Sequence, residues 1–85
     1  MNVPPYDPDG PTPIYRTLAE HLAARLEAGE WRRNERLPAE TELLTEYGVA
    51  LATLRRATGL LVEWGMVVKA QGKGTYATGD PRPQR

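Results

Sequence analysis

The stretch Gln71-Gly72-Lys73-Gly74-Thr75-Tyr76 decides the fold of this chain. Two glycines flank a single lysine, so the backbone can take the positive φ angles of a tight turn on either side of a cation. Residues that favour β-strands stand on both sides, at 66–70 and 75–78, and predict two short strands joined by this turn. We therefore expect a β-hairpin with Lys73 at its tip.

A glycine turn and a helix lie upstream of this hairpin. The stretch Tyr47-Gly48-Val49-Ala50 turns the chain sharply, and helix-forming residues continue from Leu51 to Trp64. One face of that helix is apolar, and the other face carries Leu51, Ala52, Arg55, Arg56 and Gly59. A helix opened by a turn and followed by a cationic hairpin is typical of a winged helix-turn-helix, which places the helix in the major groove of DNA and the hairpin tip beside it.

Two further helices are predicted ahead of the glycine turn. The first begins at Pro13, with Thr12 as its N-cap, and runs to about Ala28, with leucines recurring every four residues. The second is short, and Pro38 is expected at its first helical position. The segment between these helices, residues 31–37, is expected to add at most a short edge strand.

The predicted fold is mainly α with a small β-hairpin: a winged helix-turn-helix of three helices plus a two-stranded wing. We expect this domain to span residues 12–78, with a flexible arm at 1–11 and a flexible tail at 79–85, where prolines and polar residues accumulate. The apolar stripes of the helices should share one core, and they include Ile14, Leu18, Leu22, Leu54 and Leu61.

The composition limits what such a chain can do. It has 85 residues and no cysteine, so disulfides and thiolate metal sites are excluded, and its single histidine, His21, is expected at a solvated position. No apolar run approaches the ~20 residues of a membrane span, and the N-terminus lacks a secretory pattern, so a cytoplasmic location without membrane contact is expected. Because no nucleophile–base pair, metal cluster or phosphate loop is present, we expect no enzyme, no metal site and no cofactor.

The net charge is zero, but the charges are unevenly distributed. Four cations and one glutamate lie between residues 50 and 78, whereas the acidic residues gather earlier in the chain. A basic segment on a neutral whole fits one DNA-facing surface. It also predicts weak non-specific affinity, because few phosphates are neutralised. Arg32, Arg33 and Arg36 could form a second patch that binds phosphates, but the nearby acidic residues Glu30 and Glu35 weaken its positive charge.

Several short strings follow one another in a telling order: Pro13-Ile14-Tyr15-Arg16, Leu37-Pro38-Ala39-Glu40, Tyr47-Gly48-Val49, Thr53-Leu54-Arg55-Arg56-Ala57 and Gln71-Gly72-Lys73-Gly74-Thr75-Tyr76. With them, the stretch from Pro13 to Thr78 resembles the N-terminal domain of GntR-type bacterial transcription regulators. The resemblance is strongest to the HutC-like branch of the family and second strongest to the YtrA-like branch. The resemblance implies a repressor-type regulator that binds double-stranded DNA, as a homodimer on a short palindrome. It also implies that the small-molecule effector site lies outside this chain.

The resemblance places DNA contacts on the exposed face of the 51–64 helix, at the start of the helix before it and on the wing. Two departures stand out: Ala50-Leu51 replaces the family's usual Ser-Arg, and Thr41 stands where a basic residue is common. Ala50 cannot cap the helix, and Leu51 can touch only a thymine methyl or another apolar surface. We expect an altered operator or weak binding. The expected DNA-contacting residues are Thr41, Leu51, Ala52, Thr53, Arg55, Arg56, Gln71, Gly72, Lys73, Gly74 and Thr75.

Two functions stay open at the level of the sequence. The first is a sequence-specific DNA-binding domain of a transcriptional regulator, favoured by the wing and by the Thr53-Leu54-Arg55 string. The second is a winged helix that serves as a protein-interaction module with weak or no DNA binding, in which Leu51 and Ala52 form an apolar contact. Salt-dependent binding to duplex DNA separates the two.

Overall fold

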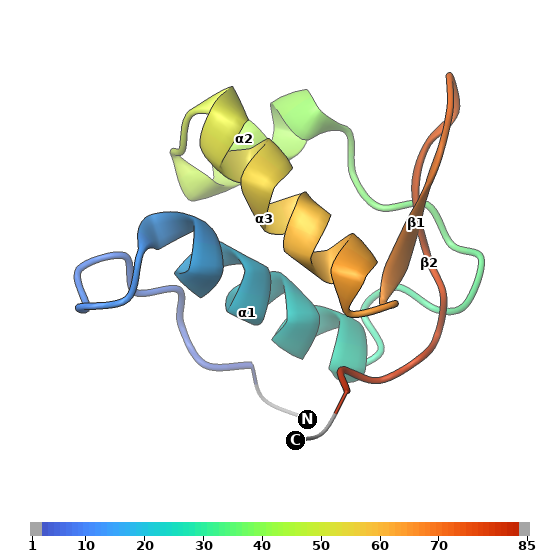
Figure 1. Ribbon diagram of the computed structural model, residues 1–85, viewed down its shortest axis with the longest axis horizontal. Coiled ribbons are helices and arrows are strands. Elements are labelled where there is room, and N and C mark those ends of the chain that lie inside the picture. Colours follow the sequence, from blue (N-terminus) through green and yellow to red (C-terminus); the bar gives the residue numbers. More distant parts are fainter. Residues whose placement is uncertain (1–2, 84–85) are drawn as a thin grey trace.

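The computed structural model describes residues 3–83, which form three helices and one two-stranded antiparallel sheet. Figure 1 shows α1 lying beneath α3, α2 beside the N-terminal half of α3, and the β-hairpin near the end of α3. The predicted winged helix-turn-helix is confirmed. The elements are α1 (Ile14–Glu27), α2 (Glu40–Tyr47), α3 (Leu51–Glu63), β1 (Val67–Ala70) and β2 (Gly74–Ala77).

The core lies between the three helices and the inner face of the hairpin. Leu22, Leu54 and Leu61, predicted to be buried, are fully enclosed, and Trp31 closes one end of the cluster. Ile14 was predicted in the same stripe, and this prediction is wrong, because its side chain is 48% exposed. Ile14 is the first residue of α1 and lies at the exposed start of the helix.

Two helix starts differ from the prediction. Pro13, and not Thr12, is the N-cap of α1, and its carbonyl accepts hydrogen bonds from the N–H groups of Arg16 and Thr17, both at 3.0 Å. Pro38 is not the first residue of α2, since the helix starts two residues later with Ala39 as its N-cap. The reason is tertiary: the N–H group of Leu37 donates to the carbonyl of Thr75 at 2.8 Å, which holds the chain extended alongside β2.

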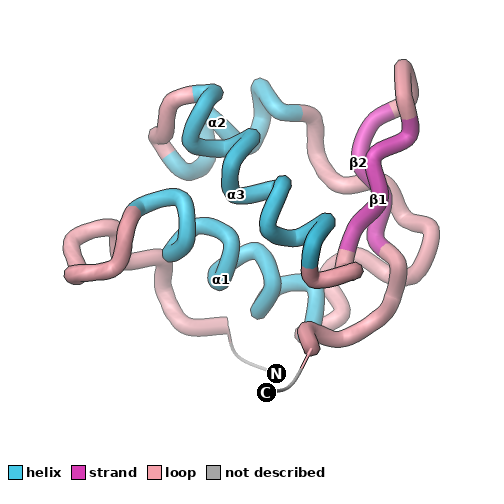
Figure 2. The backbone as a smooth tube through the Cα atoms, in the orientation of Figure 1, coloured by secondary structure: helices cyan, strands magenta, loops and turns pink. Residues whose placement is uncertain are grey.

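The wing is supported from behind by the loop that joins α1 to α2. In the hairpin, Val67 pairs with Ala77 and Ala70 pairs with Gly74. The edge strand expected within residues 31–37 is reduced to a single antiparallel bridge between Arg36 and Tyr76. Figure 2 shows this loop passing beside the two strands. The loop therefore couples the base of the wing to the start of α2.

Polar contacts fix α2 against α1. The Arg25 guanidinium lies over the Trp31 ring and bonds to Glu30, to Glu46 and to the hydroxyl of Tyr47. The pKa of the Glu30 carboxyl is held below its usual value by its hydrogen bond from Arg25. Because the Arg25 side chain is largely enclosed and bonds to both Glu46 and Tyr47, it sets the position of the C-terminal end of α2.

His21 joins this network and is half-buried, so the predicted solvated position holds only in part. Its Nε2 atom donates to the carbonyl of Pro4 at 2.9 Å, and its Nδ1 atom lies 2.7 Å from the hydroxyl of Tyr47. The ring of Tyr6 packs edge-on against both His21 and Tyr47. The N-terminal segment thus reaches the core through Tyr6, a contact that no local pattern could reveal.

The segments predicted to be flexible make defined contacts where the structure describes them. Beyond Tyr6 in the arm, the tail residue Arg82 bonds to the carboxylate of Glu27 at 2.9 Å and lies over the ring of Trp64. The outer ends of the predicted arm and tail, residues 1–2 and 84–85, lie outside the described residues. The flexibility of residues 1–11 and 79–85 stays a prediction.

Replacing Leu54 with alanine should lower the free energy of unfolding by ~2–5 kcal/mol, because it removes a fully buried side chain and leaves a cavity. Chemical denaturation followed by circular dichroism measures this change. The matched control is Val62→Ala, on the same helix but with a side chain that is 42% exposed. It should stay within about 0.5 kcal/mol of the unchanged chain. Equal losses for the two variants would show that the core is misassigned.

Candidate nucleic-acid interface

The exposed face of α3 presents a short apolar start followed by cations. Leu51, Ala52, Arg55 and Arg56 are all exposed, whereas Thr53 is half-buried and leans toward α1. Ala50 stands at the N-cap position of α3, and its methyl side chain makes no capping hydrogen bond, as expected. The N–H groups of the first turn therefore lack a capping side chain and remain available to an acceptor outside the helix.

Arg55 is held by a carboxylate from α2. Its Nε atom lies 3.2 Å from Oε2 of Glu40, and its Nη2 atom lies 3.2 Å from Oε1, so the pair is two-pronged. The hydrogen bond from Arg55 lowers the pKa of Glu40, and the same bond raises the pKa of Arg55. Glu40 is therefore ionised at neutral pH. Because both side chains are about half exposed, the pair contributes little to stability and serves mainly to orient the guanidinium.

Arg56 turns toward Tyr15 of α1. Its guanidinium carbon lies 3.9 Å from the centre of the Tyr15 ring, which places the cation over the aromatic face. Beside it, Ile14, Ala52 and Thr53 line a shallow hollow of about 320 Å³ between the starts of α1 and α3. Arg56 therefore lies at the flank of the exposed α3 face.

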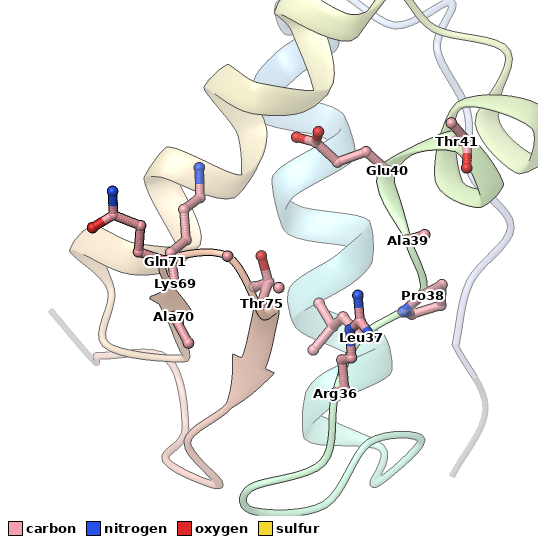
Figure 3. Close-up of a pocket in the computed structure, with 12 residues that line it drawn as sticks. Arg36, Leu37, Pro38, Ala39, Glu40, Thr41, Lys69, Ala70, Gln71 and Thr75 are labelled. Carbon is pink, nitrogen blue, oxygen red and sulfur yellow. The ribbon is translucent and has the colours of Figure 1, made fainter.

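A cleft of about 500 Å³ separates the start of α2 from the wing (Figure 3). Arg36 and Lys69 bring positive charge to it, and Glu40 brings negative charge. In Figure 3, Glu40 stands on the helix side of this cleft and Lys69 on the wing side. From the predicted contact set, the cleft brings together Thr41, Gln71, Gly72, Gly74 and Thr75.

The tip of the wing exposes Lys73 on a turn that requires glycine. Gly72 and Gly74 have φ angles of 74° and 120°, values that residues with side chains rarely adopt. A Cβ atom at Gly74 would lie 2.6 Å from Nε of Arg36, so the absence of a side chain also lets that arginine pack against the turn. Lys73 itself is exposed beyond the strands.

Sequence reasoning missed two residues of this surface: Glu40 pairs with Arg55, and Tyr15 supports Arg56. The second phosphate patch expected from Arg32, Arg33 and Arg36 does not act as one group. Arg33 pairs with Asp80 at 3.4 Å, whereas Arg36 lines the cleft. The partners of Glu40 and Tyr15 depend on tertiary packing, and no sequence pattern signals them.

The surface is suited to binding. Within residues 3–83, no group of three or more histidines and acidic side chains is placed to hold a metal ion. In the same part of the chain, no helix has the length and apolar character needed to cross a membrane. Exposed guanidinium, ammonium and hydroxyl groups beside a short apolar surface can bind phosphates and base edges.

Comparison with known proteins identifies relatives over most of the chain. Residues 14–77 match the family model described as "Bacterial regulatory proteins, gntR family". The histidine utilization repressor of Klebsiella aerogenes is 32% identical over 74 residues, which cover 87% of this chain and 30% of that protein. The repressor MngR of the mannosyl-D-glycerate transport and metabolism system in Escherichia coli is 39% identical over 67 residues, 79% of this chain and 28% of the repressor. The chain thus spans about 30% of the length of such curated relatives.

Solved structures agree with the family match. The DNA-binding domain of AraR in complex with its operator ORR3 superposes with a TM-score of 0.76 at 30% identity, covering 87% of this chain and 89% of that one. YtrA from Sulfolobus acidocaldarius, a GntR-family transcription factor, gives a TM-score of 0.78 at 26% identity, covering 93% and 83%. The resemblance drawn from the sequence is confirmed.

Proposed function

Because this chain belongs to the GntR family of bacterial regulatory proteins, we propose that it binds operator DNA through α3 and the wing, as the DNA-binding domain of a transcriptional repressor. One observation carries the proposal. Arg55 on α3 bonds to Glu40, and Glu40 lines a cleft whose other wall is the wing. The exposed face of α3, the start of α2 and the hairpin therefore form one continuous surface.

The surface has the parts that duplex recognition needs. An α-helix fits the major groove, and the first turns of a recognition helix reach the base edges. We assign base contact to Leu51, Ala52 and Arg55, which are exposed on those turns. We assign contact with the phosphate backbone to residues that flank them: Thr41, Thr53, Arg56, Gln71, Gly72, Lys73, Gly74 and Thr75.

The electrostatics favour modest affinity. Each phosphate that a cation neutralises releases counterions and strengthens binding at low salt. Here the charge of Arg55 is already paired with the carboxylate of Glu40, and the chain as a whole is neutral. We infer that two copies bind a palindromic operator, because a second half-site multiplies a weak single-site affinity. We assign neither an enzymatic reaction nor an effector site to these residues, and we place their action in the cytoplasm.

The proposal is tested by removing one cation from each part of the surface. Arg55→Ala should weaken binding to the selected operator by ~1–3 kcal/mol and relax the preference at one base pair. Lys73→Ala should weaken binding evenly across sequences and reduce the salt slope by about one unit, since one phosphate contact is lost. Fluorescence anisotropy titrations at several salt concentrations measure both effects.

The matched control is Arg33→Ala, which also removes one exposed arginine. Arg33 pairs with Asp80 at the base of the wing and does not line the cleft. Its replacement should leave affinity within about twofold of the unchanged chain, the effect expected for long-range charge alone. If Arg33→Ala weakened binding as much as Arg55→Ala and Lys73→Ala, the binding surface would lie elsewhere.

Glu40→Gln should increase the affinity for random duplex DNA by about three- to tenfold at low salt. The change removes a negative charge beside the bound phosphates and frees Arg55, so another counterion can be released. The preference for operator over random DNA should fall, because Arg55 loses the carboxylate that orients it. Titrations of both duplexes at two salt concentrations measure this.

Glu42→Gln is the control for charge alone. Glu42 lies two residues along the same helix, about half a turn around it, and does not line the cleft. It should change affinity less than Glu40→Gln and leave the operator preference intact. Weaker binding of random DNA by Glu40→Gln would instead mean that Glu40 supports the bound state.

A further inference from the structure

The start of α3 is apolar in the place where a DNA-reading helix meets the bases. Leu51 is the first residue of α3, and its side chain is 38% exposed; Ala52 beside it is exposed too. Leu51 lies one helical turn before Arg55, so both residues share one face of the helix. Any duplex that reaches Arg55 along this face therefore also meets an aliphatic side chain.

The exposure of Leu51 is not explained by the fold. It does not belong to the core cluster or to the partly buried side chains packed against it. Within residues 3–83, the other large exposed apolar residues are Ile14, Val62 and Val68. Among these four, Leu51 alone lies on the first turn of α3, the turn from which a recognition helix contacts base edges.

The chemistry of the major groove leaves one match for such a side chain. Guanine, adenine and cytosine present polar acceptors and donors there, whereas thymine adds a C5 methyl group. Leucine has no hydrogen-bonding atom, so packing it over a polar edge would remove water without supplying a partner. Packing it against a methyl group removes apolar surface from water on both sides.

We propose that Leu51 determines specificity by packing against the C5 methyl group of a thymine in the operator. The inference rests on the proposed function, because it needs α3 in the major groove. Leu51 and Arg55 lie one helical turn apart on the same face of α3, so the thymine should lie close to the base pair that Arg55 contacts.

The experiment removes that methyl group and nothing else. Duplexes that bind the 85-residue chain are first selected from a random pool, and each thymine of the selected site is then replaced singly by deoxyuridine. At the thymine that Leu51 contacts, the replacement should weaken binding about fourfold, the contribution of one buried methyl group. The Leu51→Ala chain should bind thymine and deoxyuridine duplexes within about twofold of each other, because the partner of the methyl group is gone.

Val62→Ala is the matched control, since it shortens an exposed aliphatic side chain at the far end of α3. It should keep the full sensitivity to deoxyuridine. A second variant, Leu51→Arg, should select guanine at the same position, because arginine donates to the O6 and N7 atoms of guanine. Circular dichroism confirms that each variant is folded.

The outcomes separate this inference from the proposed function. If the chain binds no duplex at any salt concentration, both are wrong. If the chain selects an operator and no deoxyuridine replacement weakens binding, Leu51 does not contact a thymine methyl, and only the inference is wrong. If Leu51→Ala retains the fourfold sensitivity, another residue contacts the methyl group. Operator binding that is unchanged in Leu51→Ala would indicate that Leu51 serves another contact, such as a protein partner, and would also overturn the inference.

Discussion

The burial of one face of α3 against α1 is the constraint on which the rest of the structure depends. Leu54 and Leu61 are fully enclosed in the core that α1 shares, and a helix has a fixed rotation per residue. Once these leucines are fixed, the outward direction of Leu51, Ala52 and Arg55 is fixed as well. The surface assigned to DNA is thus a consequence of core packing, and no separate element is needed to present it.

A second constraint on the structure is the set of contacts that segment 36–40 makes around the cleft. Arg36 packs on the turn at Gly74, Leu37 bonds to the back of β2, and Glu40 then reaches Arg55. A single extended segment therefore links the wing, the start of α2 and the exposed face of α3. The pairing of Glu40 with Arg55 reduces the charge available to phosphates. The apolar contact proposed for Leu51 would release no counterion, since it arises from surface removed from water.

Much of the fold could be predicted because it rests on local signals. The glycines around Lys73 specified the hairpin turn, and the leucine stripes identified Leu22, Leu54 and Leu61 as core residues. The errors arose where contacts distant in the sequence override local preference. Pro38 is not the first residue of its helix because Leu37 bonds to β2, and His21 is half-buried because Tyr47 and Pro4 both reach it. Within the candidate site, exposure followed from helical spacing, whereas the partners of Arg55 and Arg56 required the packed structure.

The central claim is that α3, the start of α2 and the wing bind one duplex together, and mapping amide chemical shifts by NMR tests it most directly. The ¹⁵N-labelled chain is titrated with a selected operator duplex, and the changes are followed residue by residue. We predict the largest changes in three separate segments, 40–42, 51–56 and 71–75, all saturating at the same DNA concentration, with little change at 22–30. Largest changes at 16–20 and 60–64, on the groove lined by Arg16 and Trp64, would contradict it.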